Sequence, residues 1–444
     1  GKGRKHPKEA DVFLHIAMKV AKNCRYVEPQ FTLRFDKETS EEIWDEALDA
    51  LGAGATYPTL YNDDVNVPAV MYGMRVDEKA AEQYVPFGCT EFVIQGQSTG
   101  TPNICINLLK LLTIYMNDGI DPIDGKRKSG PVPLKKLEEY QTFEEFYDGY
   151  KALLDYYLDL SVKAQYHSYE VMNQHVSFLF SSLLTDDCIA RGKALLDGGV
   201  RYLGGTNETY GNINTSDSLW VIRDLVFNQK KYTLRQLNDA MLANFNGYEA
   251  LRKDCLNCDK YGNDLETADT MANDLYEFVA KGVRDRGIAI GMQYFLIVIS
   301  NNQLNTEWGN RTAASPDGRL SCMYMNPANN PQGGANKSGP TAMLNSLAKF
   351  DAKYHGGSVQ NIKFSPSMFN ENRAVIKSLF KTYFAKGGCH LMVTVVDKGV
   401  LEDAVEHPEN YPDLIVRVSG FSAVFVDLSP NIQQELLSRV LYDK

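Results

Sequence analysis

The sequence has no hydrophobic run long enough to cross a bilayer, no dense cysteine framework and no excess of positive charge. The apolar stretch at residues 288–299 is too short and too interrupted for a membrane span, and no signal-like leader opens the chain. The eight cysteines are scattered, which is typical of a reducing compartment. The net charge of −10 argues against a surface for nucleic acid or anionic lipid. We therefore expect a cytoplasmic protein with neither nucleic acid nor membrane as a partner.

Common metal and phosphate motifs are also missing. The seven histidines show no HExxH or paired-ligand spacing, and no glycine-rich loop ends in a lysine followed by Ser or Thr. The single CxxC, Cys255 to Cys258, has no second pair of ligands near it. We interpret these two as ordinary loop cysteines in preference to a zinc or redox site. The sequence therefore predicts no metal site and no phosphate-binding loop.

The composition is that of a large folded protein. The chain has 444 residues, of which 44% are hydrophobic and 23% charged, so it can bury an ample core. Capping boxes at residues 39–42 and 142–145 predict the starts of two helices, the second long and amphipathic through about Tyr166. Periodicity predicts further helices at residues 104–116, 168–196, 234–245 and 267–286, and the apolar run that follows predicts a buried strand or helix.

One glycine near the C-terminus stands in a chemically suggestive setting, Arg417-Val418-Ser419-Gly420-Phe421-Ser422-Ala423. An unpaired electron on a glycine Cα is shared with the flanking amide nitrogen and carbonyl, and no side chain blocks abstraction of the hydrogen. The simpler interpretation is a glycine in a turn between two strands. The choice between the two depends on what else the chain carries.

A second motif, Gly88-Cys89-Thr90-Glu91, lies far upstream. Together the two segments resemble the glycyl radical enzyme family, the pyruvate formate-lyase-like superfamily, whose fingerprints are RVxGYxxxF and a GCVE loop. Phe421 replaces the usual tyrosine and Thr90 the usual valine. The stretch at residues 311–319 is similar to the family's TPDGR segment, and further similarities occur at residues 338–342, 363–366, 387–391 and 407–414.

The resemblance implies an α/β fold. The family builds a ten-stranded α/β barrel from two antiparallel half-barrels of five parallel strands, surrounded by helices and followed by a glycine-radical domain. We expect residues 1–310 to form the C-terminal part of the barrel domain with the cysteine loop, and residues 311–444 the glycine-radical domain. The chain then corresponds to the C-terminal half of such an enzyme. Either the upstream half is missing from this sequence, or a separate chain supplies it.

The resemblance also implies a mechanism. Gly420 would hold the resting radical, Cys89 would become a thiyl that attacks a substrate C–H bond, and Glu91 would act as a base with a pKa raised by burial. Residues two apart in an extended loop face the same side, which would place Glu91 beside the thiyl. Gly88 precedes the only cysteine of the loop, which argues against acyl transfer to coenzyme A, for which the family uses two adjacent cysteines.

We therefore predict a glycyl radical lyase that eliminates water or another β-leaving group, such as an amine or sulfite, from a small polar substrate. The alternatives are an arylacetate decarboxylase, a radical-bearing subunit of a split enzyme that binds no substrate, and an inactive homologue. Two sets of residues are assigned supporting roles. We expect substrate binding by Thr90, Thr206 and Asn207, although the last two could instead belong to a solvated loop. We expect support of the radical loop by Arg417, Ser419, Phe421 and His390.

The partners follow from the same resemblance. No cofactor is expected to stay bound, because an S-adenosylmethionine-dependent iron–sulfur activating enzyme would install the radical at Gly420. We expect a homodimer in an anaerobic cell, in the cytoplasm or alternatively in a bacterial microcompartment. Dioxygen should cleave the activated backbone at Gly420.

Overall fold

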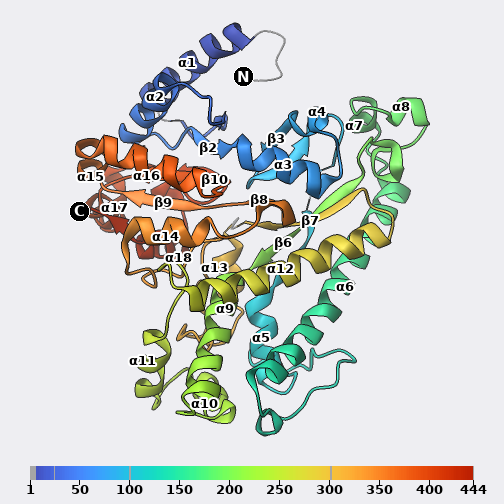
Figure 1. Cartoon of the computed structure of the whole chain (residues 1–444), viewed down its shortest axis with the longest axis vertical. Coiled ribbons are helices and arrows are strands. Elements are labelled where there is room, and N and C mark those ends of the chain that lie inside the picture. The colour runs from blue at the N-terminus through green and yellow to red at the C-terminus, as the bar shows by residue number, and fades with distance from the viewer. Residues whose placement is uncertain (1–6, 25, 100–101, 301–302, 444) are drawn as a thin grey trace.

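A computed structural model describes residues 7–24, 26–99, 102–300 and 303–443. Two β-sheets lie at its centre with helices packed around them (Figure 1). The larger sheet has the order β1-β2-β10-β9-β13 and the smaller has the order β5-β6-β7-β8. The strands of the larger sheet are β1 (Thr32–Phe35), β2 (Thr59–Asn62), β10 (His390–Val395), β9 (Asn361–Phe364) and β13 (Leu441–Tyr442). Those of the smaller are β5 (Pro102–Asn107), β6 (Gly204–Tyr210), β7 (Tyr294–Ile299) and β8 (His355–Ser358).

Strand direction reverses once in the larger sheet. β1 runs parallel to β2, and β9 runs parallel to both β10 and β13, whereas β10 is antiparallel to β2 with His390 opposite Tyr61. The smaller sheet is parallel throughout. The α/β class predicted from the sequence is confirmed, including parallel sets of opposite direction. Among the described residues the two sheets hold five and four strands, so a closed ring of ten is not formed by this chain.

Two short hairpins lie outside these sheets. One pairs β3 (Tyr84–Phe87) with β4 (Glu91–Ile94), and the other pairs β11 (Ile415–Arg417) with β12 (Ser422–Val424). Their tips carry the cysteine and glycine motifs. The short connections fix where each tip points, because a hairpin register leaves little freedom to the loop residues.

The helices follow the sequence signals closely at two capped starts. Ser40 accepts a hydrogen bond from the Ile43 amide at the start of α2, and Thr142 accepts one from Glu145 at the start of α6. The helices near these starts and along the rest of the chain are α1 (Pro7–Cys24), α2 (Glu41–Gly52), α3 (Asp63–Met74), α4 (Glu78–Ala81), α5 (Leu108–Met116), α6 (Phe143–His175), α7 (Leu179–Leu183), α8 (Cys188–Arg191), α9 (Asn212–Val221), α10 (Leu234–Leu242), α11 (Glu249–Asn257), α12 (Glu266–Ala289), α13 (Leu304–Gly309), α14 (Gly339–Leu347), α15 (Pro366–Glu371), α16 (Arg373–Ala385), α17 (Lys398–Glu406) and α18 (Pro430–Ser438).

Two elements differ from the prediction. Residues 104–116 were expected as one helix, but the first part is strand β5 and only the part from Leu108 onward is helical. Asn107 causes the change, since its side chain accepts a hydrogen bond from the Lys110 amide and so caps α5. The helix predicted for residues 168–196 is broken after His175 into α7 and α8. The apolar run after the helix at residues 267–286, predicted as a buried strand or helix, holds strand β7 in agreement with the prediction.

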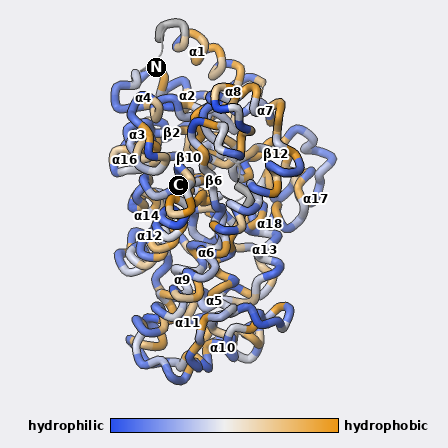
Figure 2. Tube along the Cα trace, turned by 90° about the vertical axis from the view of Figure 1, so that its right-hand side faces the viewer, coloured by the Kyte–Doolittle hydropathy of each residue, from blue (hydrophilic) through white to orange (hydrophobic). Residues whose placement is uncertain are grey.

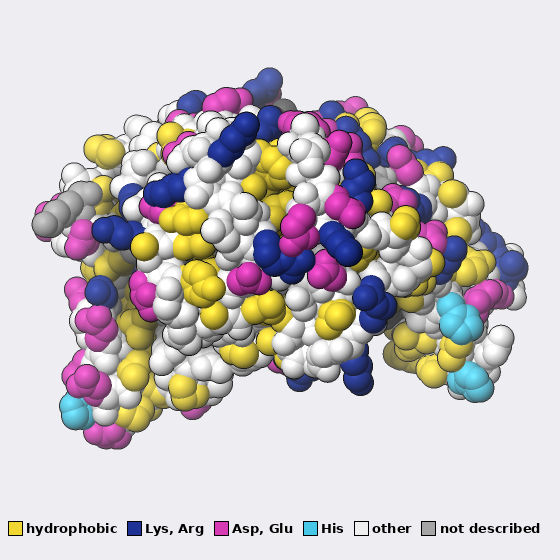
Figure 3. All heavy atoms as spheres, turned by 90° about the horizontal axis from the view of Figure 1, so that it is seen from below, with side chains coloured by type: hydrophobic (Ala, Val, Ile, Leu, Met, Phe, Trp, Pro, Cys, Tyr) yellow, Lys and Arg dark blue, Asp and Glu magenta, His cyan; other side chains and the backbone are white. Residues whose placement is uncertain are grey.

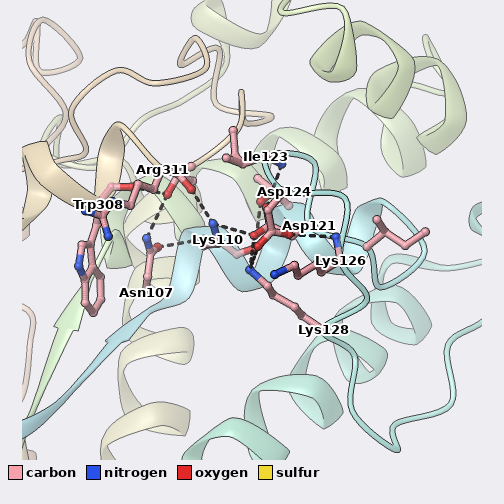
Figure 4. A network of polar contacts seen from close by, with 12 residues as sticks. Asn107, Lys110, Asp121, Ile123, Asp124, Lys126, Lys128, Trp308 and Arg311 are labelled. Atoms are coloured by element: carbon pink, nitrogen blue, oxygen red, sulfur yellow. Dashed lines mark hydrogen bonds and ion pairs between the residues drawn. The ribbon is translucent and has the colours of Figure 1, made fainter.

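A polar network ties the segment after α13 to the end of β5 (Figure 4). Lys110 donates to the Arg311 carbonyl at 2.6 Å and pairs with the buried carboxylate of Asp121 at 2.8 Å. Lys128 also reaches Asp121, at 2.6 Å. Because Asp121 holds two lysines, the loop after α5 and the segment at Arg311 are fixed to the same helix. The long irregular stretch that leads towards the glycine motif therefore starts from an anchored point.

The surface is mixed in character. Lysine and arginine side chains are interspersed with aspartate and glutamate on the face seen in Figure 3. Helix α1 carries hydrophobic residues at one extremity of the molecule (Figure 2), where Phe13 is 73% exposed. No helix among the described residues is long and apolar enough to span a membrane.

Candidate active site

The tips of the two hairpins meet in the interior. Val418 donates to the Phe421 carbonyl and Arg417 pairs with Ser422, so Ser419 and Gly420 form the two-residue tip of the β11–β12 hairpin. Gly420 has a φ of 82°, a conformation that favours glycine. A Cβ at this position would overlap Cys89 Sγ and lie 2.8 Å from Cys89 Cβ. Gly420 is thus a turn glycine, as the simpler interpretation has it, and it also lies against the cysteine, as a radical transfer between the two would require.

Cys89 lies in a tight loop. Phe87 pairs with Glu91 across the β3–β4 hairpin, and Thr90 adopts a φ of 90°. The expectation that an extended loop aligns Cys89 with Glu91 is therefore wrong, because the chain reverses direction between them. A non-glycine residue at positive φ is strained and needs its surroundings to hold it. Gly357 provides that support, since a Cβ there would lie 2.7 Å from Thr90 Oγ1.

Glu91 is a buried carboxyl group. Its side chain is 3% exposed, and burial, reinforced by the charge of Glu208, raises its pKa to about 8. Among the described residues its Oε2 atom has no hydrogen-bond partner, and neither has the Thr90 hydroxyl next to it. Buried polar atoms are usually satisfied. Two unsatisfied ones beside a buried thiol mark a place where polar atoms of a ligand could bind.

Glu208 is a second buried carboxylate, which the sequence interpretation missed. It lies on β6, where Tyr210 donates to its Oε2 at 2.5 Å and the Cys105 thiol does so at 3.5 Å. Glu208 was detectable in principle, because it is the one charged residue in a strand otherwise made of Gly, Thr, Asn and Tyr. These two donors bind the Glu208 carboxylate inside the protein.

Successive side chains of β6 point to opposite faces of the sheet, so their order decides which of them share a face with Glu208. Thr206 has the same parity as Glu208, and a Cβ at Gly356 would lie 3.5 Å from Thr206 Cγ2. Asn207 has the opposite parity and donates to Ser161 of α6 at 2.8 Å. We therefore remove Asn207 from the candidate substrate-binding residues and place Glu208 there in its stead. Thr206 and Thr90 keep that assignment as predictions.

His390 offers a hydrogen-bond donor in the same interior. The Gln360 amide donates to His390 Nδ1 at 3.2 Å, which assigns the ring proton to Nε2. Burial, followed by the charge of Arg417, lowers the pKa of His390, so the ring is neutral. Among the described residues Nε2 has no partner, and the ring lies 4.5 Å from that of Tyr61. His390 thus presents an N–H group, and its support of the radical loop stays a prediction.

Arg417 anchors the β11–β12 hairpin, which carries Gly420 and is called the glycine hairpin below. Its side chain is buried, and Nη1 donates to the Tyr57 hydroxyl at 3.2 Å and to Ser422 Oγ at 3.3 Å. The guanidinium also lies 5.2 Å from the centre of the Tyr57 ring. These contacts join β11 to the segment before β2. The sequence could not identify Tyr57, which no spacing rule connects to Arg417.

Further contacts hold the hairpin tip itself. Asn361 donates to Ser419 Oγ at 3.4 Å, and Gln30 donates to the Gly420 carbonyl at 3.1 Å. The Gly420 amide donates to Met392 Sδ at 3.4 Å. Phe421 is partly buried against the small hydrophobic cluster of the C-terminal region. Arg417, Ser419 and Phe421 thus lie in the same hairpin as Gly420, and Asn361, Gln30 and Met392 contact that hairpin; their support of a radical stays a prediction.

No group of three or more potential metal ligands occurs among the described residues. Cys255 lies on α11, not in a loop as predicted, and Cys258 follows its end. Both thiols are free, and burial raises the pKa of Cys255 to about 12 and that of Cys258 to about 11. Neither is an activated thiolate.

Comparison with known proteins finds two family matches. Residues 1–304 match the family described as pyruvate formate lyase-like, and residues 325–426 match the glycine radical domain. The chain is 30% identical to trans-4-hydroxy-L-proline dehydratase of Clostridioides difficile over 96% of its own length and 54% of that protein. It is 26% identical to the glycyl radical subunit of 4-hydroxyphenylacetate decarboxylase of the same organism, over 96% of this chain and 52% of the other.

The fold is also shared with solved structures. The glycerol-bound form of the B12-independent glycerol dehydratase from Clostridium butyricum superposes with a TM-score of 0.91 at 29% identity, over 97% of this chain and 55% of that one. The chain thus spans about half the length of the relatives it matches.

Proposed function

Because this chain belongs to the pyruvate formate lyase-like family and contains a glycine radical domain, we propose that it carries the radical chemistry of a glycyl radical lyase. Gly420 stores the radical, Cys89 transfers it to substrate, and Glu91 moves the proton. The observation that supports this most strongly is the contact between Gly420 and the Cys89 side chain inside the protein. A hydrogen atom can pass from the thiol to the Gly420 Cα without any further movement of the two loops.

The proposed reaction eliminates water or another β-leaving group from a small polar alcohol. The Cys89 thiyl takes a hydrogen atom from the carbon that bears the hydroxyl, and Glu91 removes the hydroxyl proton. The ketyl radical anion then expels the leaving group from the neighbouring carbon with its electron pair, and the group is protonated by Glu91. The resulting carbonyl radical takes the hydrogen atom back from Cys89. The net products are a carbonyl compound and the protonated leaving group.

The charges of the site support a substrate of this kind. Glu91, Glu208 and the His390 Nε2–H group supply acceptors and a donor for hydroxyl or amine groups. With its pKa near 8, Glu91 is mostly protonated in the empty site at neutral pH, so a bound donor or cation would favour its ionised, basic form. Arylacetate decarboxylation remains the second candidate, because one relative is the glycyl radical subunit of such an enzyme.

The proposal includes the partners that the radical requires. An activating enzyme that uses S-adenosylmethionine and an iron–sulfur cluster would install the radical at Gly420, with no cofactor left bound. We place the working enzyme, a homodimer, in the cytoplasm of an anaerobic cell or in a microcompartment there. A further polypeptide segment, on the same chain or another, would complete the barrel.

Exposed apolar side chains support such a covering segment. Phe13 of α1 and Phe180 of α7 are 73% and 75% exposed, and Leu179 is 70% exposed. A groove of about 1230 Å³ opens between α1 and α2 on one side and α3 and α4 on the other. Large exposed apolar residues are costly on a free surface and are typical of an interface.

The activity is tested by anaerobic activation followed by incubation with a diol, a hydroxyproline, a hydroxysulfonate and 4-hydroxyphenylacetate. Carbonyl product, pyrroline, sulfite and carbon dioxide are measured separately. Elimination products from one of the first three would support the lyase. Carbon dioxide from the last alone would support the decarboxylase, and a radical-bearing protein without any turnover would support the radical-carrier alternative.

A further inference from the structure

Met392 lies between the two reacting loops. It is on β10, is 1% exposed, and packs in a small cluster with Cys89, Ala328 and Val359. Its sulfur accepts two hydrogen bonds from the glycine hairpin, one from the Gly420 amide at 3.4 Å and one from Arg417 Nε at 3.3 Å. A single side chain therefore touches the cysteine, the glycine and the arginine that anchors the hairpin.

The chemistry of a thioether suits this place. Its sulfur accepts hydrogen bonds but carries no hydrogen of its own, so it cannot compete with Cys89 for the radical. Both N–H groups that donate to the sulfur belong to buried residues, and buried N–H groups are nearly always paired with an acceptor. A radical on the Gly420 Cα draws electron density from the adjacent nitrogen, which makes the amide N–H a better donor to Met392.

We propose that Met392 is a positioning residue of the radical site: its sulfur accepts the Gly420 N–H and thereby fixes the plane of that peptide against Cys89 and polarises the amide next to the radical. This inference rests on the proposed function, since it concerns the glycyl radical. It assigns Met392 a role that ordinary core packing would not require. A core methionine can be replaced by leucine with little consequence, whereas an acceptor cannot.

Spectroscopy of the activated protein tests the inference. The chain is labelled with 77Se-selenomethionine, coexpressed anaerobically with its activating enzyme, and studied by electron–nuclear double resonance. We expect a 77Se coupling to the glycyl radical, because the atom at position 392 contacts the Gly420 amide. The coupling should vanish in Met392→Leu and in Met392→Gln. It should persist in Met271→Leu, a matched change at a buried methionine of α12.

The amide proton gives a second, independent measurement. Exchange into D2O identifies the hyperfine coupling of the Gly420 N–H proton in each variant. We expect this coupling to change in Met392→Leu, with radical decay several-fold faster, and to return towards the wild-type value in Met392→Gln, whose side-chain oxygen is again an acceptor. Met271→Leu should match the wild type in both respects.

The outcomes separate this inference from the function on which it rests. A normal glycyl signal in all variants, without 77Se coupling and with an unchanged amide-proton coupling in Met392→Leu, would overturn the role of Met392 and leave the radical chemistry intact. If Met392→Leu does not fold, the absence of 77Se coupling in the wild type would overturn it equally. A wild-type protein that gives no glycyl signal would refute the proposed function, and the inference with it.

Discussion

The Cys89 side chain occupies the space that a Cβ on Gly420 would need. The two residues are 331 positions apart in sequence and come from hairpins that belong to neither central sheet. Glycine is thus required here for three physical reasons at once: the positive φ, the close approach of the thiol and the capacity to carry a radical. The first two can be measured without activating the protein, and only the third depends on the proposed function.

Gly420→Ala should remove the radical and destabilise the fold. The new methyl group overlaps Cys89 and sits at a φ of 82°, so we expect the free energy of unfolding to fall by about 1–3 kcal/mol. Denaturant unfolding measures the loss, and electron paramagnetic resonance after activation should show no glycyl doublet. Gly247→Ala, at an open site with similar φ, separates backbone strain from overlap. Equal losses in the two variants would contradict the close contact.

Cys89→Ser should retain the radical and lose turnover. The hydroxyl O–H bond is too strong to exchange hydrogen with a glycyl radical, although serine fills nearly the same space. We expect a glycyl doublet of normal intensity and no detectable product. Cys188→Ser, at another buried cysteine on α8, should keep both signal and activity. Normal turnover in Cys89→Ser would exclude the thiyl.

Glu91→Gln should raise stability at alkaline pH while slowing turnover by roughly 10²–10⁴-fold. The folded-state pKa of about 8 lies above the ordinary value of 4.5, so the folded protein holds a proton that the unfolded chain has released between these values. The folded wild-type protein therefore loses stability as the pH rises from 4.5 to about 8, because the unfolded chain ionises Glu91 more easily than the folded protein does. We expect the Tm of the variant to exceed that of the wild type by about 5 °C at pH 9, with no gain from this source at pH 4. A Tm difference between the variant and the wild type that does not change with pH would contradict a buried Glu91 carboxyl with a raised pKa.

Glu208→Gln should shift the pH dependence of turnover to lower pH. The charge of Glu208 helps to raise the pKa of Glu91, so its removal makes the base easier to ionise. We expect the alkaline rise of kcat/KM to begin at lower pH, together with a higher KM if Glu208 also contacts substrate. Asn207→Ala breaks only the bond to Ser161 on the other face of β6 and should leave the profile in place. If the pH profile of kcat/KM does not shift in Glu208→Gln, Glu208 does not belong to the site.

The sequence predicted the two loops that carry Cys89 and Gly420 better than it predicted the residues around them. Gly420 and Cys89 lie in contiguous motifs, and the helix starts at Ser40 and Thr142 follow from local hydrogen bonds, so both are readable from short stretches. Asn107 was overlooked as the cap that separates β5 from α5. Local hydrogen bonds thus predicted the helix starts at Ser40 and Thr142, whereas the equally local Asn107 cap lies inside an apolar stretch that suggested one continuous helix.

The remaining errors concern long-range geometry. The orientations of Asn207 and Glu208 depend on the parity of β6, which cannot be fixed until its two faces are known. Met392 belongs to an apolar strand and has no sequence feature that distinguishes it from core residues. Its partners come from a hairpin that follows it by 25 to 28 positions. Such contacts are set by tertiary packing, and no motif records them.

The most direct test of the Gly420–Cys89 relay is hydrogen exchange through the thiol. The activated protein is transferred anaerobically from H2O to D2O, and the glycyl doublet, which the remaining Cα hydrogen produces, is followed with time. We predict that the doublet collapses to a singlet in the wild type, because Cys89 exchanges its S–H with solvent and passes deuterium to Gly420, and that it stays a doublet in Cys89→Ser. A wild-type doublet that persists in D2O, or one that collapses equally without the cysteine, would contradict the relay.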